Sequence, residues 1–371
     1  MYAAATKAGP TRLLDRELRR TLLGIFTATG TKGDGEGLER FLPSERTTLC
    51  GYGRQALAIA LHRVGIGAGD LVLLPGFICR DLLGAVRTAG ADVRFYGIDE
   101  QFHIVVGSLD RADASRIRAV VAVNYFGFSQ PLDEVSAWCR ARGAVLIEDN
   151  AHGFLSADGD VPLGRRADFG IFSLRKTLAI PNGAALVDNR SGAIPTGGDA
   201  PRFEGSSLRT EVAWGAKRAI KRAMALGGLP AVRPLIGSIR RLRRLTTGSD
   251  VEVTPPYAED AIPQQALAAR TPGLLRRVAV REESTRRRSL YRQCQTMLES
   301  SAEIRPLFSE LPGQVVPQGF PFLYLGETPG HFADHWWRRG VPMIRWPDLP
   351  RGVAPDAPSH YHRVMLVPFL W

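Results

Sequence analysis

The chain has few cysteines and no long apolar segment. Its four cysteines, Cys50, Cys79, Cys139 and Cys294, lie far apart and form no C-x-x-C pair. This pattern argues against a zinc site or a disulfide framework, and it favours the reducing cytoplasm as the location. No stretch approaches the roughly 20 consecutive apolar residues that a membrane helix needs. The charged residues 1–26 do not have the apolar region typical of a signal peptide.

Basic residues outnumber acidic ones, but the excess is confined to one segment. The formal net charge is +11, and ten of the 48 Lys and Arg residues lie between Arg209 and Leu245 beside a single acid, Glu211. Apolar residues at helical spacing predict two amphipathic helices here, a basic hairpin broken at Gly227. The hairpin either packs its apolar face on the protein or presents a basic surface to an acidic membrane or polyanion. It lacks aromatic residues beyond Trp214, so we expect no nucleic-acid partner.

The composition is that of a soluble globular protein, with 371 residues, 44% hydrophobic and 23% charged. Short apolar segments that predict strands alternate with segments that predict helices. The strands are expected at 71–74, 93–96, 119–123, 144–147, 169–173 and 184–187, and the helices at 54–64, 81–89 and 132–142. This alternation predicts an α/β fold, a mostly parallel sheet with helices on both faces and ligands at the carboxyl ends of its strands.

The composition changes after Asp250. Pro255, Pro256 and Pro263 mark a junction, and residues 274–298 predict a long Arg-rich helix. Apolar segments at 320–325 and 364–370, with proline-rich turns between them, predict a small α+β domain. We therefore expect a large cofactor-binding domain over 1–250, which includes the basic hairpin 209–245, and a smaller C-terminal domain over 251–371.

A lysine and a carboxylate each follow a strand in the predicted sheet. Asp149 closes the strand at 144–147, and Lys176 follows the strand at 169–173. A lysine can hold pyridoxal phosphate as a Schiff base, and a carboxylate can pair with the pyridinium N–H of that cofactor. His152 could meet the 3-oxygen of the ring, although Asp149 and His152 taken alone are also consistent with a structural ion pair and a structural histidine. Arg175 and burial should lower the pKa of Lys176.

A phosphate site is predicted at the start of the first helix. Gly53 and Arg54 lie in a glycine-bearing turn that leads into the helix, where unpaired amides and the helix dipole favour a phosphate. Ser173 could add a hydroxyl. Glycine turns before helices are commonly only caps, so this prediction depends on the neighbouring lysine and carboxylate.

From Gly53 to Val187 the chain resembles the DegT/StrS-type sugar aminotransferases, which are fold type I pyridoxal-phosphate enzymes. The resemblance depends on the order and spacing of many landmarks rather than on one motif. They are Gly53, Ala56-Leu57, Ala60-Leu61, Gly69-Asp70, Pro75, Gly90-Ala91, Asp99, Gly127, the run Ile147-Glu148-Asp149-Asn150-Ala151-His152, Gly164, Asp168, Phe172-Ser173, Lys176 and Gly183.

The resemblance implies a role for each site residue. Lys176 would bind the cofactor and carry the proton, Asp149 would bind the pyridinium nitrogen, and His152 would lie near the ring oxygen. Gly53, Arg54 and Ser173 would hold the phosphate. The family also implies a homodimer that converts a keto sugar, usually nucleotide-linked, to an amino sugar with glutamate as donor.

The chain departs from the family at several positions. Arg54 stands where a threonine is usual, and the spacing from Ser173 to Lys176 is about two residues shorter. The aromatic residue that usually stacks on the cofactor falls near Cys79, so Phe77 is expected to substitute for it. Asn124 stands where the family has a histidine.

These departures leave three hypotheses. The chain is an aminotransferase for a keto sugar or related polyol, an enzyme of another reaction on the same cofactor, such as dehydration, or a non-catalytic relative that its basic hairpin recruits to an anionic surface.

Overall fold

A seven-stranded sheet forms the centre of the described part of the chain. The computed structural model describes residues 37–111, 113–191, 201–223, 259–298, 301–338 and 343–369. The strand order is β1-β9-β8-β5-β4-β2-β3. The strands are β1 (Thr47–Cys50), β2 (Leu71–Pro75), β3 (Asp92–Tyr96), β4 (Ile117–Val123), β5 (Val145–Asp149), β8 (Phe169–Phe172) and β9 (Ala184–Asp188). From β3 to β8 neighbouring strands are parallel, whereas β9 pairs antiparallel with both β8 and β1. The mostly parallel sheet predicted from the sequence is confirmed, but β1 was not predicted.

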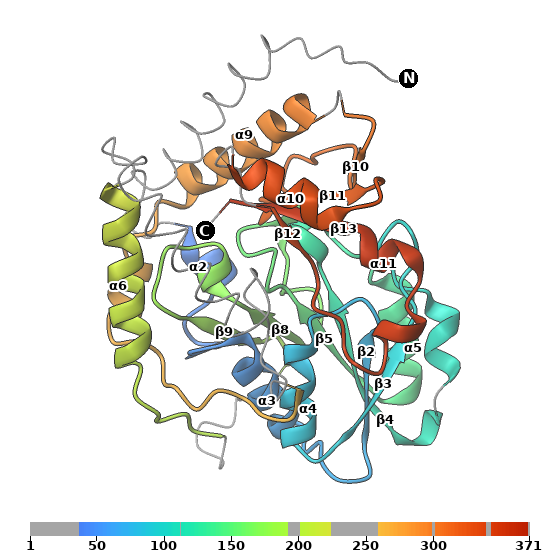
Figure 1. Ribbon diagram of the computed structural model, residues 1–371. Coiled ribbons are helices and arrows are strands. Elements are labelled where there is room, and N and C mark those ends of the chain that lie inside the picture. Colours follow the sequence, from blue (N-terminus) through green and yellow to red (C-terminus); the bar gives the residue numbers. More distant parts are fainter. Residues whose placement is uncertain are drawn as a thin grey trace.

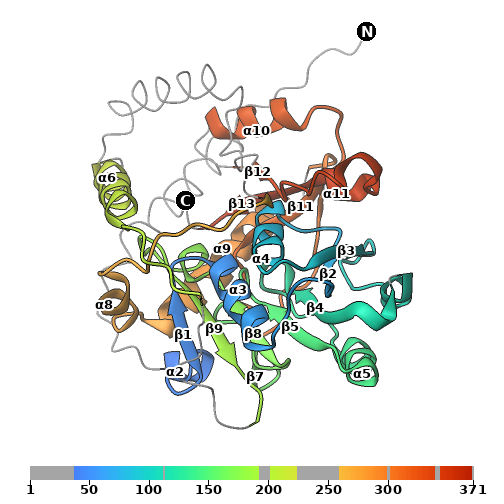
Figure 2. The same cartoon turned by 90° about the horizontal axis from the view of Figure 1, so that it is seen from below.

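Helices cover both faces of this sheet because successive strand residues point to opposite sides. Helices α3 (Gly53–Arg63) and α4 (Leu83–Thr88) bury their apolar residues with Val72, Val121 and Ile147. On the other face, α5 (Asp133–Arg142) packs with Leu71 and Val120. Figures 1 and 2 show α3 and α4 together and α5 apart from them, where it contacts β4 and β5. Nearly every residue of the inner strands is therefore apolar.

A second, four-stranded antiparallel sheet is formed by the C-terminal part of the chain. Its order is β10-β11-β13-β12, with β10 (Ile304–Pro306), β11 (Gly319–Tyr324), β12 (Ile344–Arg345) and β13 (Val364–Pro368). Helices α9 (Val280–Leu298), α10 (Pro329–Arg338) and α11 (Ser359–Arg363) accompany it (Figure 1). One apolar cluster continues from β2 and β4 through α5 to α9, β11 and β13. The domain boundary expected at residue 250 lies outside the described residues.

The helix predicted over 274–298 is instead two helices. Helix α8 (Thr271–Leu275) ends before α9 begins at Val280. Leu275 is buried in the same apolar cluster as Phe41 and Leu178. Three partly buried residues pack against this cluster: Leu274, Val278 and Val280. The chain turns between the two helices because both sides of the turn contact that cluster. The short elements α2 (Leu38–Phe41), β6 (Ala157–Asp158) and β7 (Val161–Pro162) complete the larger part of the structure.

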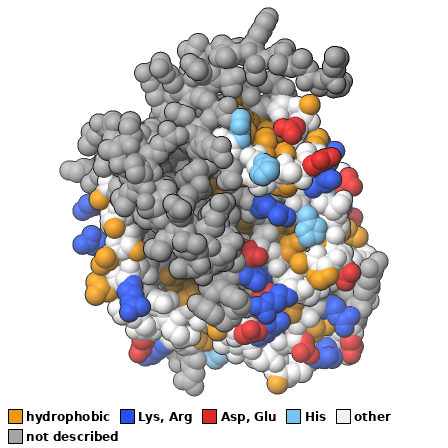
Figure 3. All heavy atoms as spheres, in the orientation of Figure 1, with side chains coloured by type: hydrophobic (Ala, Val, Ile, Leu, Met, Phe, Trp, Pro, Cys, Tyr) orange, Lys and Arg blue, Asp and Glu red, His pale blue; other side chains and the backbone are white. Residues whose placement is uncertain are grey.

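The first half of the predicted basic hairpin is a helix. Helix α6 (Leu208–Ala223) follows the predicted amphipathic pattern and exposes Leu208 and Val212, whereas residues 224–245 lie outside the described residues. Elsewhere on the face seen in Figure 3, acidic and basic side chains are interspersed. Among the helices of the described residues, none has the length and apolar character required to cross a membrane.

Candidate active site

A cleft at the carboxyl ends of β5 and β8 brings most of the predicted site residues together. Asp149 is the last residue of β5, Ser173 follows β8, and Lys176 ends the short 3-10 helix η6 (Leu174–Lys176). The cleft is lined by Tyr52, Gly53, Arg54, Ile78, Cys79, Asp81, Leu82, Val123, Asp149, Ala151, His152, Ser173, Arg175, Lys176 and Trp346. Of the predicted residues, Phe77 is the one that the lining does not include.

The amine of Lys176 is held against an imidazole. Its Nζ lies 3.1 Å from Nε2 of His152. Burial is the main influence that lowers the pKa of Lys176, and the charge of Arg175 adds to it, although Cys79 and Asp149 partly oppose the change. A lysine in this setting is unprotonated at a lower pH than an ordinary lysine, so its nitrogen is available as a nucleophile.

His152 is fixed in position and uncharged. The main-chain N–H of Phe126, a residue with left-handed backbone (φ 56°), points at Nδ1 of His152 over 3.4 Å. The two rings stack with centroids 5.6 Å apart, and burial followed by the charge of Lys176 lowers the pKa of His152 well below its ordinary value. A neutral imidazole that accepts at Nδ1 carries its proton on Nε2. The Nε2–H can therefore donate to the amine of Lys176 whenever that amine is unprotonated.

Asp149 is a buried carboxylate without a counter-ion among the described residues. Its Oδ1 accepts a hydrogen bond from the main-chain N–H of Ala151 at 2.8 Å. Burial raises the pKa of Asp149, while the hydrogen bond from Ala151 and the charge of Lys176 act in the opposite direction. A buried carboxylate is costly unless a cation or a strong donor meets it. The side chain is thus suited to pair with a cationic N–H in the cleft.

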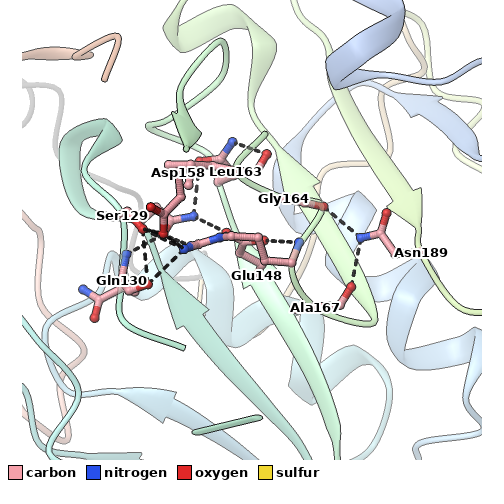
Figure 4. A network of polar contacts seen from close by, with 11 residues as sticks. Ser129, Gln130, Glu148, Asp158, Leu163, Gly164, Ala167 and Asn189 are labelled. Atoms are coloured by element: carbon pink, nitrogen blue, oxygen red, sulfur yellow. Dashed lines mark hydrogen bonds and ion pairs between the residues drawn. The ribbon is translucent and has the colours of Figure 1, made fainter. Parts of the chain in front are cut away.

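The residue before Asp149 points the other way and anchors the strand. Glu148 is fully buried, and Arg166 donates to its carboxylate from Nε at 2.9 Å and from Nη2 at 2.6 Å. Asn124, where the resemblance implied a histidine, donates to the same carboxylate at 2.8 Å. Figure 4 shows this network, which also includes Ser129 and Asp158. Because Glu148 is fixed, the neighbouring Asp149 is held at the end of β5.

The start of α3 forms the opposite corner of the cleft. Gln55 accepts hydrogen bonds from the main-chain N–H groups of Gly51 and Tyr52, which fixes the turn before the helix. The first amides of a helix have no partner within it. A Cβ on Gly53 would lie 3.8 Å from Cβ of Ser173, so the glycine and the serine face each other closely. These groups form a corner able to hold an anion.

Arg54 adds a positive charge to this corner. Its Nη1 lies 3.5 Å from Oδ2 of Asp81, and both side chains line the cleft. The arginine at this position therefore shares its charge with a neighbouring acid rather than being buried alone.

Trp346 is a residue of the cleft that sequence reasoning missed. It follows β12 and reaches the cleft from the second sheet, where its ring meets His152 edge to face at 4.8 Å. Phe77 is fully buried, and its ring packs on Trp346 at 5.1 Å rather than lining the cleft. A tryptophan in a proline-rich turn gave no local signal, because only the packing of the two sheets brings it to the cleft.

The loop that carries Trp346 is bound to the 3-10 helix η2 (Arg80–Leu82), which belongs to the larger part of the structure. Nε of Arg80 lies 3.0 Å from Oδ2 of Asp348, and the main-chain N–H of Arg80 donates to the carbonyl of Asp348 at 2.9 Å. The tryptophan is therefore part of a fixed wall of the cleft.

Part of the chain matches a known protein family. Residues 36–193 match the DegT/DnrJ/EryC1/StrS aminotransferase family, which confirms the resemblance predicted from the sequence. The protein MosB of Rhizobium meliloti is 29% identical over 200 residues, which is 50% of this chain and 39% of MosB. The L-glutamine:scyllo-inosose aminotransferase of Streptomyces griseus is 32% identical over 138 residues, 36% of this chain and 32% of that protein.

The fold is shared over nearly the whole chain. The PLP-form structure of a Streptococcus pneumoniae protein superposes with a TM-score of 0.62 at 14% identity, covering 96% of this chain and 91% of that one. The chain spans only about two fifths of the length of the first curated relatives that it matches. At these identities the structural likeness establishes the fold.

Proposed function

We propose that this DegT/StrS-type chain is a pyridoxal-phosphate-dependent aminotransferase that converts a keto sugar to an amino sugar with glutamate as donor. The observation that carries the proposal is the position of Lys176 Nζ, 3.1 Å from His152 Nε2, in a cleft that Asp149 also lines. A nucleophilic amine and a buried carboxylate in one cleft are the two groups that this cofactor needs from a protein.

The residues present fit the cofactor. The buried carboxylate of Asp149 has no counter-ion among the described residues, so it suits the pyridinium N–H. Gly53, Arg54 and Ser173 lie where the phosphate would be held, and His152 lies beside the amine, where the 3-oxygen is expected. Pyridoxal phosphate, when bound, supplies a carbonyl for covalent attachment and a ring that accepts electrons while an amino group passes between substrates.

The protein's own groups have distinct tasks in this proposal. Lys176, whose pKa is lowered by burial, would hold the cofactor covalently and would carry protons to and from the substrate carbon. His152 keeps the amine in place through Nε2. Asp149 would pair with the protonated ring nitrogen, and this pairing would offset the cost of burying its carboxylate.

Absorbance spectroscopy tests the proposal directly. Mixing the protein with pyridoxal phosphate should give a visible band, and glutamate should make the band fall. Lys176→Ala should abolish the band, while Lys217→Ala, a lysine on α6 away from the cleft lining, should leave it unchanged. Borohydride trapping and peptide mapping should then locate the cofactor on Lys176 among the five lysines of the chain. An identical spectrum from Lys176→Ala would refute the assignment.

The substrate and the donor need a separate comparison. The S. griseus relative is named for L-glutamine and scyllo-inosose, so glutamate should be compared with glutamine, and a keto sugar with a keto polyol. Consumption of the sugar without transfer of nitrogen would instead favour dehydration. We also propose a cytoplasmic homodimer, which light scattering would test by a mass of twice 40.5 kDa.

A further inference from the structure

A buried arginine on a distant helix donates a hydrogen bond to the segment that carries Lys176. Arg287 lies on α9, accompanying the second sheet, and its side chain is completely buried. Its Nη2 donates to the main-chain carbonyl of Thr177 at 2.6 Å, and Thr177 directly follows Lys176. The same guanidinium donates from Nη1 to the carbonyls of Pro317 and Gln318, each at 3.1 Å. One side chain therefore connects the lysine segment to the chain entering β11.

The charge of Arg287 is balanced by Glu283, which lies one helical turn earlier on α9. Nε of Arg287 donates to Oε1 of Glu283 at 2.7 Å. Burial alone would raise the pKa of Glu283, but Arg287 and Arg286 outweigh it, and the pKa of that carboxyl is lowered. Burial lowers the pKa of Arg287 to about 10, so the guanidinium stays charged at neutral pH. A fully buried ion pair adds little net stability compared with apolar packing, so its presence here calls for another reason.

The lysine segment is a short turn rather than part of a long helix or strand. In its 3-10 helix the N–H of Lys176 donates to the carbonyl of Ser173 and the N–H of Thr177 to that of Leu174, both at 3.0 Å. The N–H of Leu178 also donates to the carbonyl of Leu174 at 2.7 Å, and the N–H of Arg175 to that of Gly183 at 3.3 Å. Such a turn is weak on its own. The contact with Arg287 is therefore a direct restraint on the backbone one residue from the amine.

We propose that Arg287 is a positioning residue that holds the Lys176 backbone so that Nζ stays against His152, and that it ties the lysine to the second sheet. Its catalytic meaning depends on the proposed function. Its effect on the order of the lysine segment does not.

Substitutions of Arg287 and of its neighbour Arg288 separate positioning from general stability. Arg288 also donates to main-chain carbonyls, those of Pro312 and Val315, but does not contact the lysine segment. In the full chain without cofactor, Arg287→Met should raise hydrogen exchange over residues 174–178 at least tenfold. Arg288→Met should change it less than twofold. Arg287→Lys keeps the charge but not the forked geometry, and should give an intermediate value.

The pH dependence of cofactor attachment is a second measurement that tests the proposal. Loosening the segment admits water to Lys176, so its pKa moves back toward the ordinary value. The pH at which half of the protein is trapped by borohydride should therefore rise in Arg287→Met, remain unchanged in Arg288→Met, and be partly restored in Arg287→Lys. If Arg287→Met does not fold, Arg287→Lys alone must show both shifts.

Two results would overturn the proposal. One is a folded Arg287 variant with unchanged exchange over 174–178 and an unchanged pH midpoint. The other is an equal effect of Arg288→Met on both. A wild-type chain that binds no pyridoxal phosphate would refute the proposed function, while increased exchange in Arg287→Met would still show that the arginine holds the segment.

Discussion

Replacing Arg166 with methionine should destabilise the protein far more than breaking a surface ion pair. Arg166 donates twice through its side chain to the carboxylate of Glu148, at 2.9 and 2.6 Å, and Glu148 has no solvent exposure. The substitution leaves that carboxylate without its counter-charge. Removing one partner of a buried pair costs about 3–5 kcal/mol, so we expect the free energy of unfolding to fall by about that amount.

Asp158 provides a matched control on the same arginine. It accepts from Nη1 of Arg166 at 2.7 Å, but its side chain is 54% exposed. Exposed ion pairs contribute about 0.2–1 kcal/mol, so Asp158→Asn should lower the free energy of unfolding by no more than that. Both acids contact one guanidinium, but Glu148 is fully buried and Asp158 is largely exposed (Figure 4).

Urea denaturation at pH 7, followed by circular dichroism, measures both changes. Adding Glu148→Gln to the Arg166→Met protein should recover much of the loss, because it removes the unpaired charge and keeps the shape of the side chain. An Arg166→Met protein within about 1 kcal/mol of wild type, or an equal cost for Asp158→Asn, would refute the reasoning.

Three further predictions concern the cleft and its supports. Burial raises the pKa of Asp149 in the folded protein, so the folded state binds that proton more tightly and wild-type stability falls as the pH rises through this pKa. Above about pH 4, the melting temperature of cofactor-free Asp149→Asn should therefore rise relative to that of the wild type. A difference in melting temperature that does not change with pH would contradict this. Gly164→Ala should lower the free energy of unfolding, measured by urea denaturation, by about 2–5 kcal/mol, because it strains a positive φ and places a Cβ 2.3 Å from Phe172. Gly159 also has a positive φ but has open space around it, so Gly159→Ala should lower the free energy of unfolding by about 1–2 kcal/mol. Trp346→Ala should raise the dissociation constant of pyridoxal phosphate several-fold, as expected for about 0.5–1.5 kcal/mol of ring contact, and equal binding measured by fluorescence would show that the ring does not contact the cofactor.

The sequence was most informative where the chemistry is local. The strands around Asp149 were predictable because inner parallel strands are apolar throughout, and the acidic residue at the end of such a strand stands out. Lys176 was found in the same way, as a charged residue directly after a buried strand. Their positions in the sheet then follow from topology, because the carboxyl ends of parallel strands meet at one edge.

Tertiary contacts account for what the sequence did not reveal. Strand β1 is short and pairs with β9 at the sheet edge, so its residues carry no strong pattern. Trp346 reaches the cleft and His152 only through the packing of the second sheet. Arg287 lies in the Arg-rich helix predicted over residues 274–298, but its contact with Thr177 spans 110 residues, a pairing that no periodicity indicates.

The apolar cluster that runs from β2 and β4 into β11 and β13 limits how this protein can be engineered. Cutting the chain between the sheets would separate Phe77 from Tyr361, whose rings lie 4.9 Å apart and are both buried in the intact protein. We expect neither fragment to fold and remain soluble on its own. Substrate preference would have to be redesigned by substitution within the intact chain rather than by exchanging the C-terminal sheet with that of a relative.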